Sequence, residues 1–139
     1  MKYLLDTCVV SDFIKGDVNT LHQVKSIVPL EIAISTITIM EIEFGLALNL
    51  KLAKKIKPII SDFLGAIHIL DFTRNDASQV ALARALLKQQ GSPIGSYDIL
   101  LAGTALNNKL IMVTSNIKEF SKIPSLKIEN WRTSIESKS

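Results

Sequence analysis

The sequence has few of the residues on which several common kinds of site depend. One cysteine in 139 residues, Cys8, excludes a disulfide framework and an all-cysteine metal site, and favours a reducing compartment. Only two histidines are present, His22 in a polar stretch and His68 in a short apolar run, and we interpret both as structural or surface residues. Zinc and Ser-His-Asp chemistry are therefore disfavoured.

Other absences narrow the function further. The sequence contains neither a GxGxxG nor a GxxxxGK[ST] pattern, so dinucleotide and P-loop binding are not indicated. Aromatic residues make up 6% of the chain, which gives poor support for a base-stacking platform. No uncharged apolar run reaches the roughly 18 residues of a membrane span, and Asp6 interrupts the start where a signal peptide would stay apolar. We expect a soluble, cytoplasmic protein without membrane contact.

What the chain does contain is enough apolar residues for one core. Hydrophobic residues make up 47% of the sequence, well outside the disordered range. Lys and Arg total 16 against 13 Asp and Glu, and this net charge of +3 permits a nucleic-acid partner without requiring one. The length predicts a single domain, which we place at residues 1–132, followed by a flexible tail at 133–139.

Short apolar runs alternate with longer helical patterns along the chain. Four runs bounded by polar turn formers predict buried strands at 3–5, 32–35, 67–70 and 110–114. Helices are predicted at 9–14, 37–49, 51–64, 76–90 and 98–107. This order indicates an α/β fold with a four- to five-stranded, mainly parallel sheet covered by helices on both faces.

Polar residues stand where these elements meet one edge of the predicted sheet. Asp6 closes the first strand, and Glu41 lies in the first turns after the second. Asp98 opens the helix that feeds the strand at 110–114, and Asn116 follows that strand directly. Because the carboxyl ends of parallel strands share an edge, we expect these four side chains to meet there.

A cluster of carboxylates at one edge favours a divalent cation. Two carboxylates ~4 Å apart repel by about 4 kcal/mol at an effective dielectric near 20, so a fold that gathers three must protonate some or bind a cation. Oxygen ligands without histidine or thiolate favour Mg²⁺ or Mn²⁺, which can activate water and stabilise the leaving oxygen of a phosphodiester. The residues therefore predict metal-assisted phosphoryl hydrolysis.

Most of these residues also have a structural explanation. Asp6 could cap the helix after the first strand, and Asp98 could be a first-turn acid that suits the helix dipole. Asn116 and Glu119 fit a capping arrangement, but they lie one turn apart on a helix and could equally face the same ion. The pattern alone leaves both explanations open.

Glu41 has two competitors of its own. It stands three residues after Thr38, which is the spacing of a capping box. Glu43 is a rival for the site, because this helix is apolar almost all round and its periodicity does not choose between the two acids. Gly45, one turn after Glu41 on the same face, leaves room for close approach there.

Four segments of the chain match the motifs of a known family in order. The opening Tyr-Leu-Leu-Asp-Thr-Cys-Val-Val-Ser is similar to an LLDTN start, and the segment 35–45 is similar to S-x-x-T-x-x-E-x-x-x-G. The segment 93–106 is similar to I-x-x-x-D-x-x-I-A-x-x-A, and 113–120 to V-T-x-N-x-x-[DE]-F. Together with the closing Glu129-Asn130-Trp131, nearly the whole chain resembles PIN-domain proteins, specifically the VapC-type ribonuclease toxins of toxin–antitoxin pairs.

The resemblance implies an endoribonuclease that depends on Mg²⁺ or Mn²⁺. It implies that the catalytic and metal-binding residues are Asp6, Glu41 and Asp98, completed by Glu119, Asn116 or both. Thr114 would support the site through its hydroxyl, and Thr7 is the second expected supporting residue. Cys8 replaces the family's usual Asn, and we interpret it as a small apolar filler. Asn116 is neutral where some relatives have Asp, which should weaken a second metal site.

The resemblance also implies partners. The protein partners are a cognate antitoxin, which covers the acidic pocket with an amphipathic segment, and a second copy of the chain in a homodimer. The nucleic-acid partners are an RNA substrate, for which tRNA is one class, and operator DNA, which is bound only through the antitoxin.

Several lysines lie on or beside one helical face or after the first helix. They could guide RNA through salt-dependent, sequence-blind attraction, or they could form an ordinary solvated face. They are Lys15, Lys51, Lys54, Lys55 and Lys57.

Two other classes of function stay in competition. A haloacid-dehalogenase-like phosphatase needs a second Asp two residues after the first, where this chain has Cys8, and a receiver domain needs an acidic pair at the first strand. A non-catalytic metal-binding module with the same fold is favoured only by the neutral Asn116.

Overall fold

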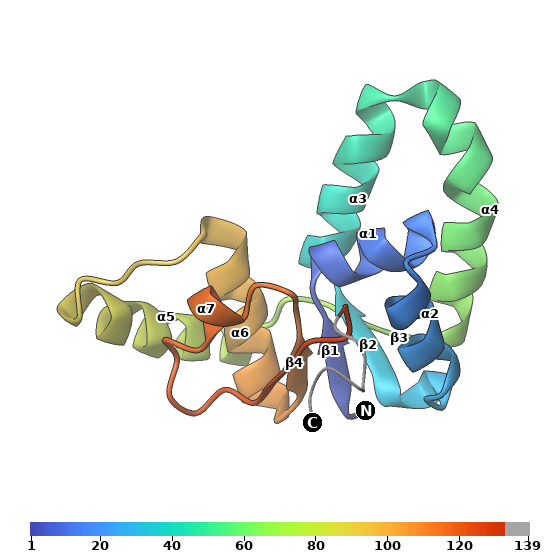
Figure 1. Ribbon diagram of the computed structural model, residues 1–139. Helices are drawn as coiled ribbons and strands as arrows, with labels where there is room; N and C mark the ends of the chain where they lie inside the picture. The colour runs from blue at the N-terminus through green and yellow to red at the C-terminus, as the bar shows by residue number, and fades with distance from the viewer. Residues whose placement is uncertain (133–139) are drawn as a thin grey trace.

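Five short parallel strands form the centre of the computed structural model, which describes residues 1–132 (Figure 1). The strands are β1 (Tyr3–Leu5), β2 (Ile32–Ser35), β3 (His68–Leu70), β4 (Ile111–Val113) and β5 (Ile128–Glu129). Their order across the sheet is β3-β2-β1-β4-β5, and every neighbouring pair is parallel. The expected α/β fold with a parallel sheet of four or five strands is confirmed.

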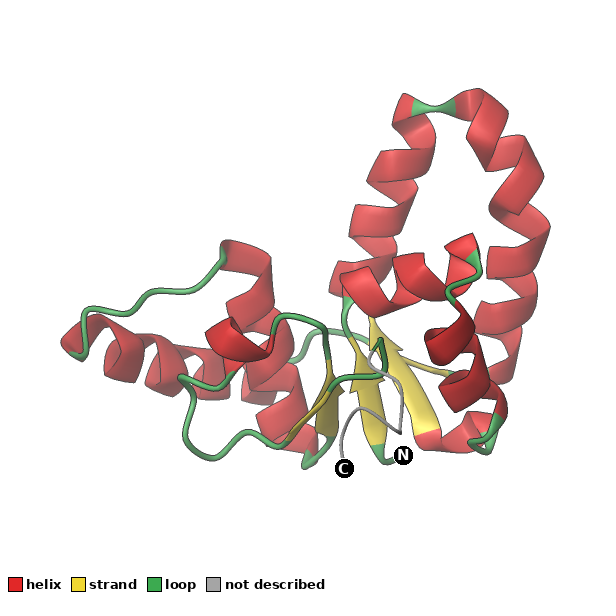
Figure 2. Ribbon diagram, viewed as in Figure 1, coloured by secondary structure: helices red, strands yellow, loops and turns green. Residues whose placement is uncertain are grey.

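Helices connect the successive strands (Figure 2). In chain order they are α1 (Thr7–Lys15), α2 (Val18–Lys25), the 3₁₀ turn η1 (Pro29–Glu31), α3 (Thr36–Leu48), α4 (Leu50–Ala66), α5 (Arg74–Gln89), α6 (Ser96–Asn108) and α7 (Ile117–Phe120). The chain first builds β2 and β3 outward from one side of β1, then crosses to the other side for β4 and β5. This reversal makes the carboxyl edge of β1 and β4 the topological switch point, where open α/β folds bind ligands.

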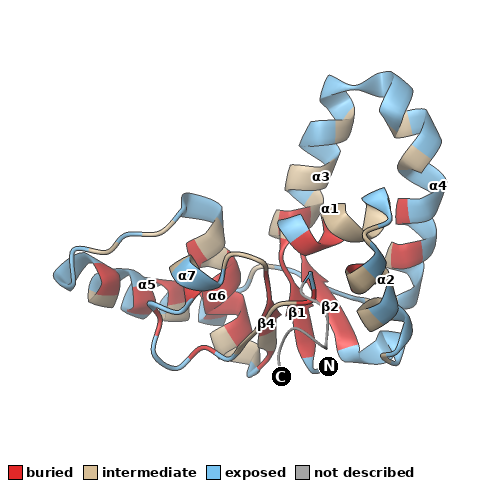
Figure 3. Ribbon diagram, viewed as in Figure 1, coloured by how far each residue is buried: buried red, intermediate tan, exposed pale blue. Residues whose placement is uncertain are grey.

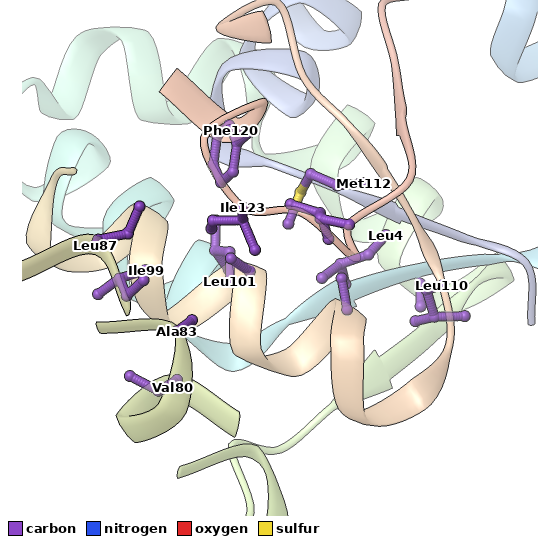
Figure 4. Packing of buried hydrophobic residues seen from close by; sticks show 14 residues of the cluster. Leu4, Val80, Ala83, Leu87, Ile99, Leu101, Leu110, Met112, Phe120 and Ile123 are labelled. Carbon is purple, nitrogen blue, oxygen red and sulfur yellow. The ribbon is translucent and has the colours of Figure 1, made fainter. Parts of the chain in front are cut away.

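The strands divide their side chains between two cores. Leu4 of β1 and Met112 of β4 pack with residues of α5 and α6, as Figure 4 shows. Their chain neighbours Leu5 and Val113 point the other way and pack with α1 and with Phe63 of α4. Because successive side chains of a strand face opposite sides of the sheet, even three-residue strands serve both cores. Figure 3 shows the buried strands between the two groups of helices, so the expected helices on both faces are confirmed.

The third strand differs from the expectation of a buried run. His68 and Ile69 of β3 are exposed, because β3 lies at the edge of the sheet beyond β2. The composition of an apolar run does not report where its strand lies in the sheet. Residues 67–70 therefore look like a central strand in sequence, although β3 lies at the edge. Strand β5 was not located in advance, since it has only two residues, and α2 was indicated only as a helix-like polar stretch around His22, without bounds.

Capping explains where the helices depart from the predicted bounds. Helix α5 begins at Arg74 rather than 76, because Thr73 and Asp76 form a capping box ahead of it. The hydroxyl of Thr73 accepts a hydrogen bond from Asp76 N at 3.1 Å, and Asp76 Oδ2 accepts one from Thr73 N at 3.0 Å. Helix α4 also ends later than predicted, at Ala66 rather than 64, and it contains Pro58.

The core extends to the end of the described segment. Trp131 is fully buried and packs edge-on against Tyr3, with ring centroids 5.2 Å apart. The predicted tail at 133–139 lies outside the described residues. Within residues 1–132, none of the helices combines the length and the apolar character needed to span a bilayer.

Candidate active site

Asp6 stands at the carboxyl end of β1 and is also the N-cap of α1. Its Oδ1 accepts a hydrogen bond from Val9 N at 2.9 Å, and the hydroxyl of Thr114, just after β4, donates another to its side chain. The residue is only 2% exposed, and this burial raises the pKa of Asp6 although the two hydrogen bonds lower it. The capping explanation of Asp6 is therefore confirmed, and the same side chain lies at the carboxyl end of β1, where the sequence predicts a site.

Glu41 reaches the same edge from the second turn of α3. Thr7 Oγ1 lies 2.7 Å from Glu41 Oε1, as its hydrogen-bond donor, and 3.3 Å from Thr38 Oγ1. The alternative capping box between Thr38 and Glu41 is not formed, because the N-cap of α3 is Ser35. Glu43 is exposed on the other flank of the helix. Of the two rival acids, the structure brings Glu41 to the edge and leaves Glu43 away from it.

Asp98 occupies the first turn of α6 and is half-buried. Burial raises its pKa to about 6, and the negative charges of Glu119, Asp6 and Glu41 add to the increase. Three carboxylates from other segments of the sequence are therefore close enough to disfavour the ionisation of Asp98.

Glu119 and Asn116 form a hydrogen-bonded network beside Asp98. Glu119 Oε1 accepts a hydrogen bond from Gly95 N at 2.6 Å, and its Oε2 accepts one from Asn116 Nδ2 at 2.8 Å. These two bonds lower the pKa of Glu119, the backbone bond most. Asn116 N in turn donates to Thr114 Oγ1 at 3.0 Å. Gly95 is the N-cap of α6 and has no side chain, so Glu119 satisfies a backbone donor at that helix start.

The chemistry of these donors fits a hard divalent cation. Carboxylate, amide and hydroxyl oxygens predominate, and the excess negative charge that raises the pKa of Asp98 is what a bound cation would relieve. Within residues 1–132, no three Asp, Glu, His or Cys side chains already form a group that could hold an ion. In the conformation described, the carboxylates of Asp6, Glu41 and Glu119 accept hydrogen bonds from the chain itself.

A groove leads from Glu41 along α1, α3 and α4. It has a volume of about 510 Å³ and is lined mainly by apolar side chains, with Thr7, Lys15 and Lys55 among the polar ones. Lys51 and Lys54 are exposed on α4 but do not line this groove. Lys57, also exposed, lines a separate cavity formed by α3 and α4.

The interpretation of Cys8 as an apolar filler is wrong. Val9 and Val10 are the residues of this turn that enter the core, being 2% and 1% exposed, and Cys8 is exposed to solvent. Partial desolvation, and then the charges of Asp6 and Asp98, raise the pKa of the Cys8 thiol. The thiol is therefore a poor nucleophile at neutral pH, because the reactive form is the thiolate. His22 and His68 are both exposed, as expected of surface residues.

Comparison with known proteins agrees with this arrangement. The model of the PIN domain family matches residues 3–126. Over 131 residues the chain is 30% identical to the tRNA(fMet)-specific endonuclease VapC of Salmonella typhimurium, covering 94% of this chain and 98% of that protein. The chain belongs to the PIN-domain family and is of the VapC type.

Two further VapC relatives cover nearly the whole chain. The ribonuclease VapC2 of Haemophilus influenzae is 32% identical over 142 residues, which span 94% of this chain and 98% of that one. The crystal structure of VapBC2 from Rickettsia felis, bound to a DNA fragment from its promoter, contains a chain that is 31% identical. That chain superposes with a TM-score of 0.86 over 94% of this chain and 99% of its own length.

The sequence did not indicate one group that contacts this cluster of acids. Gly95, whose backbone N–H donates to Glu119, has no side chain and belongs to none of the predicted elements. The signal available was that a helix begins there without a side chain able to cap it.

Proposed function

We propose that this VapC-type chain is a Mg²⁺- or Mn²⁺-dependent endoribonuclease and the toxin of a toxin–antitoxin pair. One observation carries the proposal: carboxylates from four separate segments lie at one edge of the sheet, where burial and then the charges of Glu119, Asp6 and Glu41 raise the pKa of Asp98 to about 6. Membership of the family supplies the class of reaction, hydrolysis of RNA phosphodiesters. The phosphatase and receiver alternatives lose their support, because the match to the PIN domain spans residues 3–126.

Asp6, Glu41 and Asp98 are the residues that would hold the ion. When bound, the ion supplies a Lewis acid and lowers the pKa of a water molecule. Thr114 and Thr7 orient the carboxylates of Asp6 and Glu41 through their hydroxyls. Such hydrogen bonds to ligand carboxylates fix their direction and their basicity.

Glu119 and Asn116 act in this proposal by positioning Asp98. Both oxygens of Glu119 already accept hydrogen bonds, one of them from Gly95 at the start of α6. Asp98 lies three residues beyond Gly95 in the same first turn. Holding that turn in place fixes the direction from which Asp98 approaches the other acids.

We propose tRNA as the class of RNA substrate. The relative from Salmonella typhimurium is named for its action on tRNA(fMet). In this chain, Lys15 and Lys55 lie along the groove that leads to Glu41, where they would attract a phosphate backbone. We expect the protein to act in the cytoplasm, where a tRNA substrate would be found.

The same groove is proposed to receive the antitoxin. Its lining combines Ile42, Leu46 and Ile56 with the polar end at Glu41, which suits an amphipathic segment. The Rickettsia felis relative was solved as VapBC2 on promoter DNA, which supports operator binding through the antitoxin. For a homodimer, the exposed stripe of Phe44 and Leu48 on α3, 65% and 72% exposed, is the proposed contact.

Two matched substitutions test the proposed activity. Asp6 and Asp17 are both aspartate N-caps, of α1 and α2, and asparagine caps a helix about as well as aspartate. Asp6→Asn should lower tRNA cleavage at least about 100-fold while the protein stays folded. Asp17→Asn should cleave like the parent, and a chelator should stop the parent. Equal cleavage by the parent and the Asp6→Asn protein would contradict the proposal.

A further inference from the structure

A second cavity adjoins the segment that leads into α6. Its volume is about 490 Å³, and it is lined by α5, by the segment 93–96 and by the first turns of α6. Figure 1 shows this segment returning from the far end of α5 to the start of α6. Ser96 lines the cavity only two residues before Asp98, and the neighbouring Gly95 is the residue held by Glu119. The cavity and the carboxylate cluster therefore share one short stretch of backbone.

Two cations stand at the rim of this cavity. Arg84 and Lys88 lie one turn apart on α5, and both are exposed. The ion pair found within residues 1–132 is Arg132 with Asp12, so in that range neither Arg84 nor Lys88 pairs with a carboxylate. Like charges one turn apart on a helix cost a few tenths of a kcal/mol, which a bound anion would offset.

The remainder of the lining is apolar. Leu87 and Ile99 are buried at 2% and 7% exposure, and Pro93 and Ile94 come from the connecting segment. The hydroxyl of Ser96 adds a polar group. An apolar floor next to two cations suits a nucleotide, whose phosphate is anionic and whose sugar and base have apolar faces.

We propose that this cavity is an RNA subsite remote from the scissile phosphate. Arg84 and Lys88 bind backbone phosphates, and the floor between α5 and the segment 93–96 receives a sugar or base. The subsite rests on the proposed ribonuclease function. RNA that extends past the first turn of α6 then contacts both Asp98 and this cavity, so the subsite orients the strand across the carboxylates.

The test compares two double variants that lose the same charge. The rim variant, Arg84→Gln with Lys88→Gln, loses the two cations at the rim of the cavity. The control variant, Arg74→Gln with Lys25→Gln, loses two exposed cations elsewhere. Binding of labelled tRNA is measured by fluorescence anisotropy in chelator, so that no cleavage occurs. The rim variant should bind about 10-fold more weakly, and its salt dependence, the slope of log K against log salt, should fall by about 1.4. The control should stay within about twofold of the parent.

Cleavage by the same proteins separates the possible failures. With metal present, the rim variant should show a raised KM for tRNA, with the change falling on KM rather than kcat. A rim variant that binds and cleaves like the control would overturn the subsite and leave the ribonuclease proposal standing. A parent that neither binds nor cleaves RNA would overturn the ribonuclease proposal itself. Loss of antitoxin binding with RNA binding intact would overturn the subsite in favour of a protein-docking surface.

Discussion

At the residue scale, the properties of Asp98 summarise the electrostatics of the site. It is half-buried in the first turn of α6, where the helix dipole should favour its ionised form. Its pKa is nevertheless raised to about 6, by burial first and then by Glu119, Asp6 and Glu41. Burial and the neighbouring negative charges together therefore outweigh the local benefit of the helix start, and a cation would relieve the repulsion.

The raised pKa values predict how stability depends on pH without metal. The folded chain takes up a proton on Asp98 near pH 6, whereas an unfolded chain does so near 3.9, so lowering the pH from 7 to 5 favours the folded state. Asp6, whose pKa is also raised, acts in the same direction. We expect the melting temperature in chelator to rise by about 3 °C over this interval, measured by scanning calorimetry.

Two controls accompany that measurement. The Asp98→Asn protein should lose most of the rise, because it has no carboxylate to protonate. Saturating Mn²⁺ at pH 7 should raise the melting temperature of the parent by mass action. A parent whose melting temperature in chelator falls between pH 7 and pH 5 would contradict the electrostatic account.

The sequence predicted which acids approach the edge but not how they are held. Asp6 and Asp98 follow from strand ends and helix starts, which topology places at one edge. The choice of Glu41 over Glu43 depends on a hydrogen bond from Thr7 across 34 positions of sequence, and no local pattern reports that contact. The bond from Gly95 to Glu119 is equally non-local.

At the scale of elements, the packing of α5 on α6 holds in place the helix whose first turn carries Asp98. Gly103 allows these helices to touch, because a Cβ there would lie 2.2 Å from Val80 Cγ2 and 2.9 Å from Val80 N. Asp76 joins the pair through its carboxylate, which is 1% exposed and accepts a hydrogen bond from Asn107 Nδ2 at 2.7 Å. A glycine and a satisfied buried acid thus set the distance between the two helices.

Substitution of Gly103 should therefore be costly. Gly103→Ala should reduce the free energy of unfolding by about 3 kcal/mol, because the new methyl group collides with the backbone of α5. Gly65→Ala, in α4 with nothing within 4 Å of the added Cβ, should raise it by about 1 kcal/mol. Urea denaturation of both proteins gives the two values. Equal stability of Gly103→Ala and the parent would show that the helices can separate without cost.

The elements predicted well are those with strong local signals. The strands at 3–5 and 32–35 match β1 and β2, and all five predicted helices are present with shifted ends. The shifts follow from caps such as Thr73, which stands outside the apolar periodicity. The edge position of β3 and the existence of β5 depend on the order of strands in the sheet, which periodicity does not encode.

At the scale of the whole molecule, topology explains why these acids meet. The chain leaves β1 toward β2 and β3 and later returns to β4 on its other side, so the loops after β1 and β4 are neighbours. Asp6 and Thr114 follow those two strands directly and hydrogen-bond to each other. Helices α3 and α6 begin at the same edge and contribute Glu41 and Asp98.

In the proposed site, this edge of the sheet binds one divalent cation between acids from distant segments. Anomalous diffraction from a crystal soaked in Mn²⁺ tests it most directly. We predict a manganese peak coordinated by carboxylate oxygens of Asp6 and Asp98, with Glu41 turned toward it directly or through water. A soaked crystal in which these side chains are ordered and manganese is found only elsewhere would contradict the account.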